Sequence, residues 1–203
     1  MGVIQPNGDE WDFWSTQMPS GDWTNGSTLH CSESGNHSNI VTGSGSLPHS
    51  ATSGAALSAG NLRVNELENG SIPHAIFVVI PSSNGYVYPG QSNAAQGGSI
   101  PIGARVQLKY TDAQIDAMTG LAAWEKTLLH QLHDYGLYAL DTGGDGRITY
   151  KWESPTQYTS FGGTNPGAAW VNANTPPASW TPNGINWATD LLIVDACYAG
   201  GTC

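Results

Sequence analysis

The segment Glu10-Trp11-Asp12-Phe13-Trp14 places two carboxylates at a spacing that suits catalysis. On a β-strand the side chains of Glu10 and Asp12 point to the same face and lie roughly 7 Å apart along the strand. Two carboxyl groups in such an arrangement can share the roles of acid and base in glycoside hydrolysis. The alternative interpretation is structural: Trp11 and Phe13 face the core, and the two acids are solvated.

The same strand resembles that of the laminarinase-type retaining glucanases, which carry a Glu-x-Asp-x-x-Glu sequence on a sandwich. In that family two carboxyl groups about 5 Å apart serve as nucleophile and as acid/base. Here Ser15 stands at the position of the last glutamate. The acid/base half of the motif is therefore missing, which disfavours a glucanase site of this type.

A second set of residues, Arg63, Glu66 and His74, leads into an apolar segment. Their order resembles the Arg…Glu followed by Ile-x-His of alginate-lyase-like jelly rolls. A lyase needs a cation to neutralise the uronate carboxylate and a base to remove the C5 proton. Arg63, His74 and a tyrosine such as Tyr110 offer those groups. The competing interpretation, which we favour, is that His74 is a buried histidine bonded to backbone at the start of a strand.

Two further acids follow the pattern of a calcium loop. In residues 141–146 (DTGGDG), acids hold the first and fifth positions and glycine the sixth, so Asp141 and Asp145 are the candidate metal ligands. The closing acid, Glu153, comes one residue too late for that loop, and the glycines are typical of a hairpin turn. We therefore predict first a hairpin that pairs the flanking strands, and second a weak calcium site. No other cofactor is expected.

His130 and His133 lie three residues apart, a spacing at which two helical histidines can chelate a metal. Their neighbours place them on the polar side of an amphipathic helix. A solvated face is the interpretation that we favour.

Eight tryptophans are many for 203 residues, and several lie in or beside loop-rich stretches. A flat indole that is exposed at such a place can stack on the face of a sugar, which suggests a glycan partner. The candidate substrate-binding residues are Trp14, Trp23, Trp170 and Trp180. The alternative is that tryptophan fills a core poor in phenylalanine, which accounts for most of the eight.

Charge and composition limit the environment of the chain. It has 16 acidic and 6 basic residues, a formal charge of −10, and only 11% charged residues. The negative charge disfavours nucleic acid and anionic membrane surfaces as partners. A low charged fraction with abundant Gly, Ser, Thr and Asn is typical of secreted β proteins, and no run of about 18 apolar residues occurs. We therefore expect an extracellular location.

The scaffold for these side chains is expected to be rich in sheet. Short runs of Val, Ile, Tyr, Trp and Thr alternate with turn residues, as in a many-stranded sandwich. The clearest expected strands are 10–14, 72–81, 85–88, 104–110 and 191–195, of which 72–81 and 191–195 have the composition of core strands. The predicted fold is mainly β: a jelly-roll or concanavalin-like β-sandwich in one domain over residues 1–203.

One amphipathic helix is expected to pack on the sheet. A Thr-x-x-Gln capping pattern opens at Thr111, and Gly120 interrupts the helical pattern. Residues 121–135 then carry an apolar stripe with three- and four-residue spacing, which Gly136 ends.

The three cysteines lack the spacing of a zinc or haem site. Cys197 and Cys203 bracket a short glycine-containing segment, so a terminal disulfide that leaves Cys31 as a thiol is one alternative. A bond between Cys31 and either of the other two is an equal alternative.

Several motifs, taken in order, resemble a group of uncharacterised secreted bacterial proteins. They are Trp-Asp-Phe-Trp at 11–14, Ala-Thr-Ser-Gly at 51–54, Gly-Ser-Ile-Pro-His-Ala at 70–75, Gly-Ala-Arg-Val-Gln-Leu at 103–108 and Tyr-Gly-Leu-Tyr…Asp at 135–141. The members usually carry further residues upstream, which implies that this chain is the C-terminal portion of a longer precursor. No activity carries over from the group. The resemblance implies that Asp12, His74, Arg105 and Asp141 should be considered together.

Two functional hypotheses follow. The first is a secreted protein that binds glycans or acts on them as a polysaccharide hydrolase or lyase, with Glu10, Asp12, Glu66, His74 and Arg105 as the candidate catalytic residues. The second is a non-catalytic structural or adhesive module that self-assembles or coats a surface. An enzyme should gather these polar residues in a cleft beside an exposed tryptophan, whereas an assembly module should open its strand edges to other copies. Whether the chain is an enzyme stays open.

Overall fold

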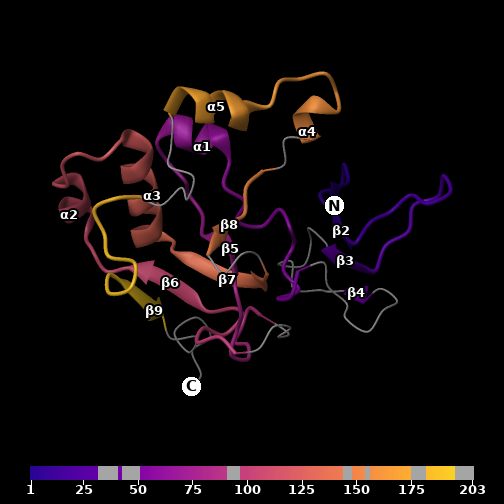
Figure 1. Ribbon diagram of the computed structural model, residues 1–203, viewed down its shortest axis with the longest axis horizontal. Helices are drawn as coiled ribbons and strands as arrows, with labels where there is room; N and C mark the ends of the chain where they lie inside the picture. Colours follow the sequence, from indigo (N-terminus) through magenta and orange to yellow (C-terminus); the bar gives the residue numbers. More distant parts are fainter. Residues whose placement is uncertain are drawn as a thin grey trace.

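The computed structural model describes residues 1–31, 41–42, 51–90, 97–143, 148–153, 156–174 and 182–194. These residues form two β-sheets and five helices (Figure 1). One sheet has four strands in the order β1-β2-β3-β4, and the other has five in the order β8-β5-β7-β6-β9. The prediction of a sheet-rich chain with two sheets is confirmed, but the fold is mixed rather than mainly β, because helices cover the larger sheet.

The four-stranded sheet is antiparallel throughout. It consists of β1 (Gly2–Ile4), β2 (Glu10–Trp14), β3 (Ser27–Cys31) and β4 (Val41–Thr42). Along β2 the burial of the side chains alternates, with Glu10 and Asp12 buried and the residues between them half-exposed. This is the period of two that a strand with one covered face requires.

The five-stranded sheet is mixed. It consists of β5 (Ile76–Ile80), β6 (Arg105–Leu108), β7 (Leu137–Thr142), β8 (Thr149–Tyr150) and β9 (Leu191–Val194). Strands β5 and β7 pair in parallel, and the other pairs are antiparallel. A parallel pair needs a long crossover, which here contains β6 and two helices.

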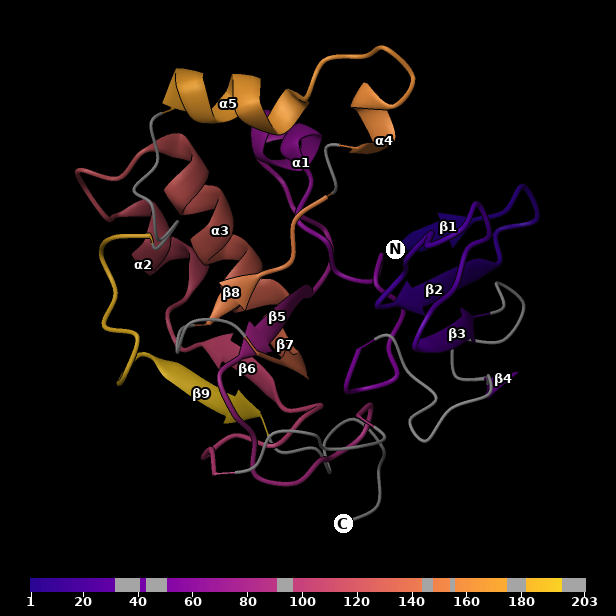
Figure 2. The ribbon, with the colours of Figure 1, turned by 45° about the vertical axis from the view of Figure 1, so that its right-hand side comes forward.

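Five helices accompany the sheets, namely α1 (Val64–Asn69), α2 (Asp112–Asp116), α3 (Ala123–Asp134), α4 (Thr156–Thr159) and α5 (Pro166–Asn174). The predicted helical region is confirmed as α2 followed by α3. Thr111 caps α2, and Gly120 and Gly136, both with positive φ, separate and end the two helices. The helix α3 packs on β6 and α2 packs on α3 (Figure 2).

The main hydrophobic core lies between the five-stranded sheet and the helices. Trp124, Leu128, Leu129 and Leu132 of α3 meet the face of β5 that carries Ile76 and its alternate neighbours. The opposite face of the sheet packs on residues 51–57 in a smaller cluster that contains Phe77 and Leu140. The four-stranded sheet has its own small cluster, formed by Leu29, Cys31 and Ala56.

The segment 51–58 therefore lies between the two sheets. Its residue Ala51 packs on the larger sheet, and its residue Ala56 packs on the smaller one. In the described part of the chain, no hydrophobic cluster joins the two sheets directly, as the layers of a β-sandwich would be joined.

Two predictions about single strands are wrong. The expected hairpin between β7 and β8 does not form, because β8 pairs with β5. Residues 191–194 form a strand at the edge of the sheet instead of a core strand, and Leu192 and Ile193 are exposed there.

Among the helices that the structure describes, none has the length and apolar character needed to cross a bilayer.

Candidate functional site

The carboxylates of Glu10 and Asp12 point to the same face of β2, as predicted, but that face is covered. Glu10 is 4% exposed and Asp12 is 0% exposed. The backbone N–H of Leu57 donates to Asp12 Oδ2 at 2.7 Å, and that of Ser58 donates to Glu10 Oε1 at 2.9 Å. The hydroxyl of Ser58 donates to Glu10 Oε2. Backbone from residues 57–58 thus occupies the place where a substrate would have to lie.

The burial of this pair changes the acidity of Asp12. Burial raises the pKa of the Asp12 carboxyl to about 7, the Leu57 N–H lowers it, and the neighbouring Glu10 raises it again. In the ionised form Asp12 Oδ1 has no hydrogen-bond partner among the described residues. A proton on Asp12 would give this oxygen a partner in Glu10 and would remove the repulsion between two buried charges. The raised pKa means that Asp12 binds this proton at a higher pH than an ordinary aspartate does.

The thiol of Cys31 lies in register with Glu10 on the neighbouring strand. It is buried and free. Burial, followed by the charges of Asp12 and Glu10, raises the pKa of the Cys31 thiol to about 11. This thiol is therefore protonated and unreactive at neutral pH. Cys197 and Cys203 lie outside the described residues.

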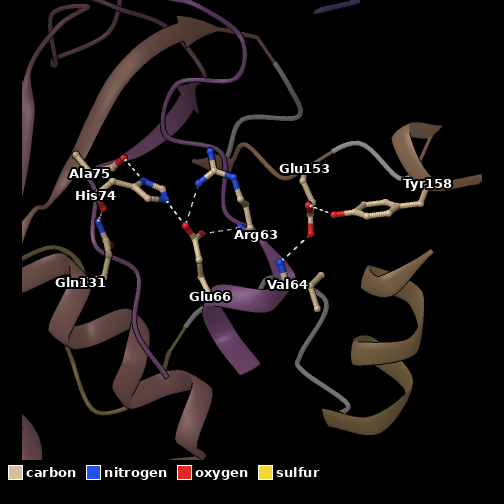
Figure 3. A network of polar contacts seen from close by, with 8 residues as sticks. All are labelled: Arg63, Val64, Glu66, His74, Ala75, Gln131, Glu153 and Tyr158. Atoms are coloured by element: carbon tan, nitrogen blue, oxygen red, sulfur yellow. Dashed lines mark hydrogen bonds and ion pairs between the residues drawn. The ribbon is translucent and has the colours of Figure 1, made fainter. Parts of the chain in front are cut away.

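The second predicted group, Arg63, Glu66 and His74, does come together at the start of α1 (Figure 3). Glu66 Oε1 accepts from Arg63 Nη1 at 3.0 Å and from His74 Nε2 at 2.9 Å, and Glu66 Oε2 accepts from the Arg63 backbone N–H at 3.0 Å. The side chains of Arg63, His74 and Glu66 are 45%, 25% and 11% exposed. Unlike the buried Glu10 and Asp12 pair, this group is within reach of solvent.

Both ring nitrogens of His74 are engaged. The Nδ1 atom lies 2.9 Å from the carbonyl oxygen of Ala75, and Nε2 faces the Glu66 carboxylate. Because each ring nitrogen already faces a carbonyl or carboxylate oxygen, neither is free to approach a substrate proton, which suits a structural contact better than a base. The contact with backbone was expected from the sequence, but His74 is half-exposed rather than buried.

The candidate base Tyr110 is not part of this group. Its hydroxyl donates to Asp190 Oδ2 at 2.8 Å, and this bond raises the pKa of the Tyr110 phenol. Asp190 also accepts from Lys109, and the Lys109 ammonium is the first cause that holds the pKa of Asp190 below its usual range. These contacts join the two residues that follow β6 to the residue that precedes β9.

Arg105 reaches the end of α3 rather than Glu66 or Asp12. Its Nε atom donates to the carbonyl of Tyr135 at 2.9 Å, and its Nη2 atom donates to the carbonyl of Asp134 at 3.3 Å. A cation at the carboxyl end of a helix satisfies carbonyls that have no partner within the helix. Gln131 donates from Nε2 to the carbonyls of His74 and Gly136 and so links the His74 group to this helix end.

The described residues do not gather all the candidate catalytic side chains in one place. Glu66 and His74 are in contact, whereas Glu10 and Asp12 form a separate buried pair. Arg105 donates to carbonyl groups at the end of α3. Each of the three groups makes contacts that hold the fold.

Of the two candidate calcium ligands, the structure describes only Asp141. Asp141 Oδ1 accepts from the backbone and the hydroxyl of Thr52 and from the backbone of Thr142, at 2.9 to 3.1 Å. Asp145 lies outside the described residues. Glu153, which follows the closing position of the calcium-loop pattern by one residue, is buried. It accepts from the Val64 N–H at the start of α1 and from the Tyr158 hydroxyl (Figure 3).

The described residues do contain one group that could hold a metal ion, formed by Asp112, His133 and Asp134. The sequence offered one signal for it, the spacing of His130 and His133, which we assigned to a solvated face. His130 lies beside the group and contacts Asp112 at 2.7 Å. The partner from α2 was missed because only tertiary packing brings α2 and α3 together.

The predicted sugar-binding tryptophans separate into two kinds. Trp14 and Trp23 are 58% and 63% exposed, whereas Trp170 is 5% exposed. Trp170 packs edge-on against Trp124, with ring centroids 6.1 Å apart, in the main core. It offers no open face to a sugar and is a core residue, as the alternative interpretation holds for most tryptophans. Trp180 lies outside the described residues.

Trp14 and Trp23 belong to one hairpin: Trp14 is the last residue of β2, and Trp23 lies in the connection from β2 to β3. Two backbone hydrogen bonds of 2.8 Å join Gln17 and Thr24 and extend the pairing beyond the strands. The indole of Trp14 lies against Gly26, where an added Cβ would come within 2.8 Å of the ring. The hairpin thus presents two large aromatic side chains to solvent on a hydrogen-bonded frame.

Comparison with known protein families, curated proteins and solved structures gave no match for this chain.

Proposed function

We propose that this protein is an extracellular glycan-binding protein and that Trp14 and Trp23 form its sugar-contacting surface. The observation that carries the proposal is the exposure of both indoles on the single β2–β3 hairpin. Burying an indole is the usual outcome in a folded chain, so two indoles left more than half exposed on one hairpin favour a binding role. Sugars offer apolar C–H faces that match such rings.

The support of Trp14 strengthens the proposal. Its ring rests on Gly26, which has no side chain to separate the ring from the backbone. A ring fixed in this way loses little conformational freedom when a ligand binds, which favours affinity. The excess of 16 acids over 6 bases favours neutral glycans over polyuronates.

A glycan array with the complete chain tests the proposal, followed by titration of the best ligand. Trp14→Ala and Trp23→Ala should each weaken binding by at least about tenfold, as expected for central aromatic contacts. Phe161→Ala is the matched control, because Phe161 is 90% exposed and lies outside the hairpin. Binding that survives both tryptophan substitutions, or an array without any ligand, would refute the proposal.

A hydrolase or lyase activity is the more specific form of this proposal, and it has less support. The exposed Arg63 beside His74 and Glu66 is the arrangement that favours it. Reducing-sugar and unsaturated-uronate assays on the array ligands test it. Glu66→Gln should abolish any turnover that depends on this group.

Four expectations from the sequence stay predictions. They are calcium binding at Asp141 and Asp145, a jelly-roll or concanavalin-like arrangement, a single domain and a longer precursor.

The second candidate function, a self-assembling structural or adhesive module, is favoured by one observation. The edge strand β9 exposes Leu192 and Ile193 at 55% and 58%, and its described residues carry no charge. Uncharged apolar edges invite pairing with another chain. Light scattering over a range of concentrations tests this, and Ile193→Lys should abolish any assembly while leaving glycan binding unchanged.

A further inference from the structure

The end of α3 and the start of α2 bring three metal-binding side chains together. Asp112 is the first residue of α2, and His133 and Asp134 close α3. Each offers one ligand atom, and the three atoms lie within 4.8 Å of one another. One imidazole nitrogen and two carboxylate oxygens form a mixed ligand set that divalent transition metals accept.

The backbone beneath these ligands is fixed by side chains from the sheet. Gln107 of β6 donates to the carbonyl of His133, and Arg105 donates to the carbonyl of Asp134. On the other helix, the Thr111 N–H donates to Gln114 Oε1 at 2.9 Å, which fixes the turn that carries Asp112. The backbone on both sides of the site is therefore held in place, which lowers the cost of ordering the ligands.

A neighbouring histidine orients one ligand. His130 lies one turn before His133 on α3, with Nδ1 2.7 Å from Asp112 Oδ1 and Nε2 3.0 Å from Asp116 Oδ1. A carboxylate held by a second hydrogen-bonding group is a common feature of metal sites and tightens them. Asp112 is thus positioned by His130 and remains 58% exposed, within reach of an ion from solvent.

The ring of His133 supplies an independent observation. Its Nδ1 atom is buried and has no hydrogen-bond partner in the part of the chain that the structure describes. A buried polar atom without a partner is costly, and such atoms often mark the place of an ion or another missing partner. In metal sites both nitrogens of a histidine have a role, one as the ligand and the other as a donor.

We infer that Asp112, His133 and Asp134 form a zinc-binding site that joins α2 to α3. Calcium and magnesium prefer sets made of oxygen alone, whereas zinc takes imidazole nitrogen together with carboxylate oxygen. At zinc–ligand distances of about 2.0–2.2 Å, tetrahedral ligand atoms lie roughly 3.4 Å apart. Binding of zinc therefore requires the two exposed carboxylates to move closer than the spacing of up to 4.8 Å in this structure.

Isothermal titration of the chelator-treated full chain with Zn²⁺ tests the inference, with Ca²⁺ and Mg²⁺ as separate arms. Binding of one Zn²⁺ per chain and weaker or no binding of Ca²⁺ and Mg²⁺ are expected. His133→Ala and Asp112→Asn should each weaken binding by more than the ~10–100-fold that is typical for loss of a group that only orients a ligand. Asp116→Asn, which changes such an orienting partner, should weaken it less.

His30→Gln is the matched control, because His30 also pairs with an aspartate, Asp9, but lies on the other sheet. It should bind Zn²⁺ as the parent chain does. Circular dichroism identifies any variant that fails to fold, and the imidazole signals in NMR spectra of the parent chain provide a readout independent of variants. Zn²⁺ should perturb the ring signals of His133 and leave those of His30 unchanged. Absence of Zn²⁺ binding, unchanged affinity in His133→Ala, or perturbation confined to other histidines would overturn the inference.

Discussion

Replacing Asp12 by asparagine should remove a pH dependence of stability and make the protein more stable at neutral and basic pH. The asparagine side chain has nearly the same shape, would still accept from the Leu57 N–H, and would donate to Glu10 through its amide. It would thus keep the hydrogen bonds of the protonated acid and would never place a second negative charge in the buried pair.

The sign follows from proton binding in the two states. Burial raises the pKa of Asp12 in the folded protein to about 7, whereas the unfolded chain has the ordinary value near 3.8. Between these two values the folded protein holds a proton that the unfolded chain has lost, so the free energy of unfolding falls as the pH rises from about 4 to about 7. Above that range this contribution stays absent. One pKa unit corresponds to about 1.4 kcal/mol, which sets the contribution on the order of 4 kcal/mol.

Urea unfolding between pH 4 and pH 8, followed by tryptophan fluorescence and circular dichroism, measures this effect. The quantity of interest is the free energy of unfolding of Asp12→Asn minus that of the parent chain, because titrating groups that do not interact with Asp12 cancel in this difference. It should be small at pH 4 and rise to several kcal/mol at pH 8. Asp22→Asn, at an exposed position, should give a flat difference. A flat difference for Asp12→Asn as well would refute the reasoning about the buried pair.

Three further predictions concern single positions. Gly26→Ala should weaken glycan binding without unfolding the chain, because the new Cβ would come within 2.8 Å of the Trp14 ring and displace it; unchanged affinity in the glycan titration would contradict the role given to Gly26. Gly103→Ala should destabilise the fold by more than about 2 kcal/mol in urea unfolding, because φ is +88° and the Cβ would lie 1.8 Å from a backbone carbonyl oxygen. Asp190→Asn should lower the free energy of unfolding at pH 7 and have less effect near pH 2, because hydrogen bonds, that of Lys109 first, hold the pKa of Asp190 below its usual range and their contribution is lost on protonation. An equal loss at both pH values would argue against this last prediction.

The sequence predicted the parts of this fold that depend on local rules. The strand β2 follows from its alternation, and the α2–α3 region follows from the Thr111 cap and from Gly120 and Gly136. The strand β5 follows from its continuous apolar run, because both faces of this strand are covered. In each case a window of a few residues contains the information.

The parts that were not predicted depend on pairings between distant segments. The glycines after β7 are typical of a hairpin, yet β8 pairs with β5 about 70 residues away in sequence. The alternation of β2 placed Glu10 and Asp12 on one face correctly, but only residues 57–58, far along the chain, decide that this face is buried. The alternation of residue types along a strand shows which side chains share a face. It does not show whether that face is covered by a loop of the protein or is open to water.

The zinc-binding group shows the same limit. The spacing of His130 and His133 is visible in the sequence, but its meaning changes once Asp112 lies beside it. Helical spacing alone describes a pair of side chains on one helix. The ligand from the other helix depends on how α3 packs on its neighbour.

The position of residues 51–60 between the two sheets has a consequence for engineering the chain. This segment donates to Asp12 on one sheet and to Asp141 on the other, and the Gly60 carbonyl accepts from Phe77 of β5. An insertion in this segment would displace the donors and acceptors that bond to each sheet, so it would disturb both sheets. Tags, fusion points and cross-linking sites are therefore better placed in the exposed residues 161–164 between α4 and α5, which belong to neither sheet and lie outside the β2–β3 hairpin.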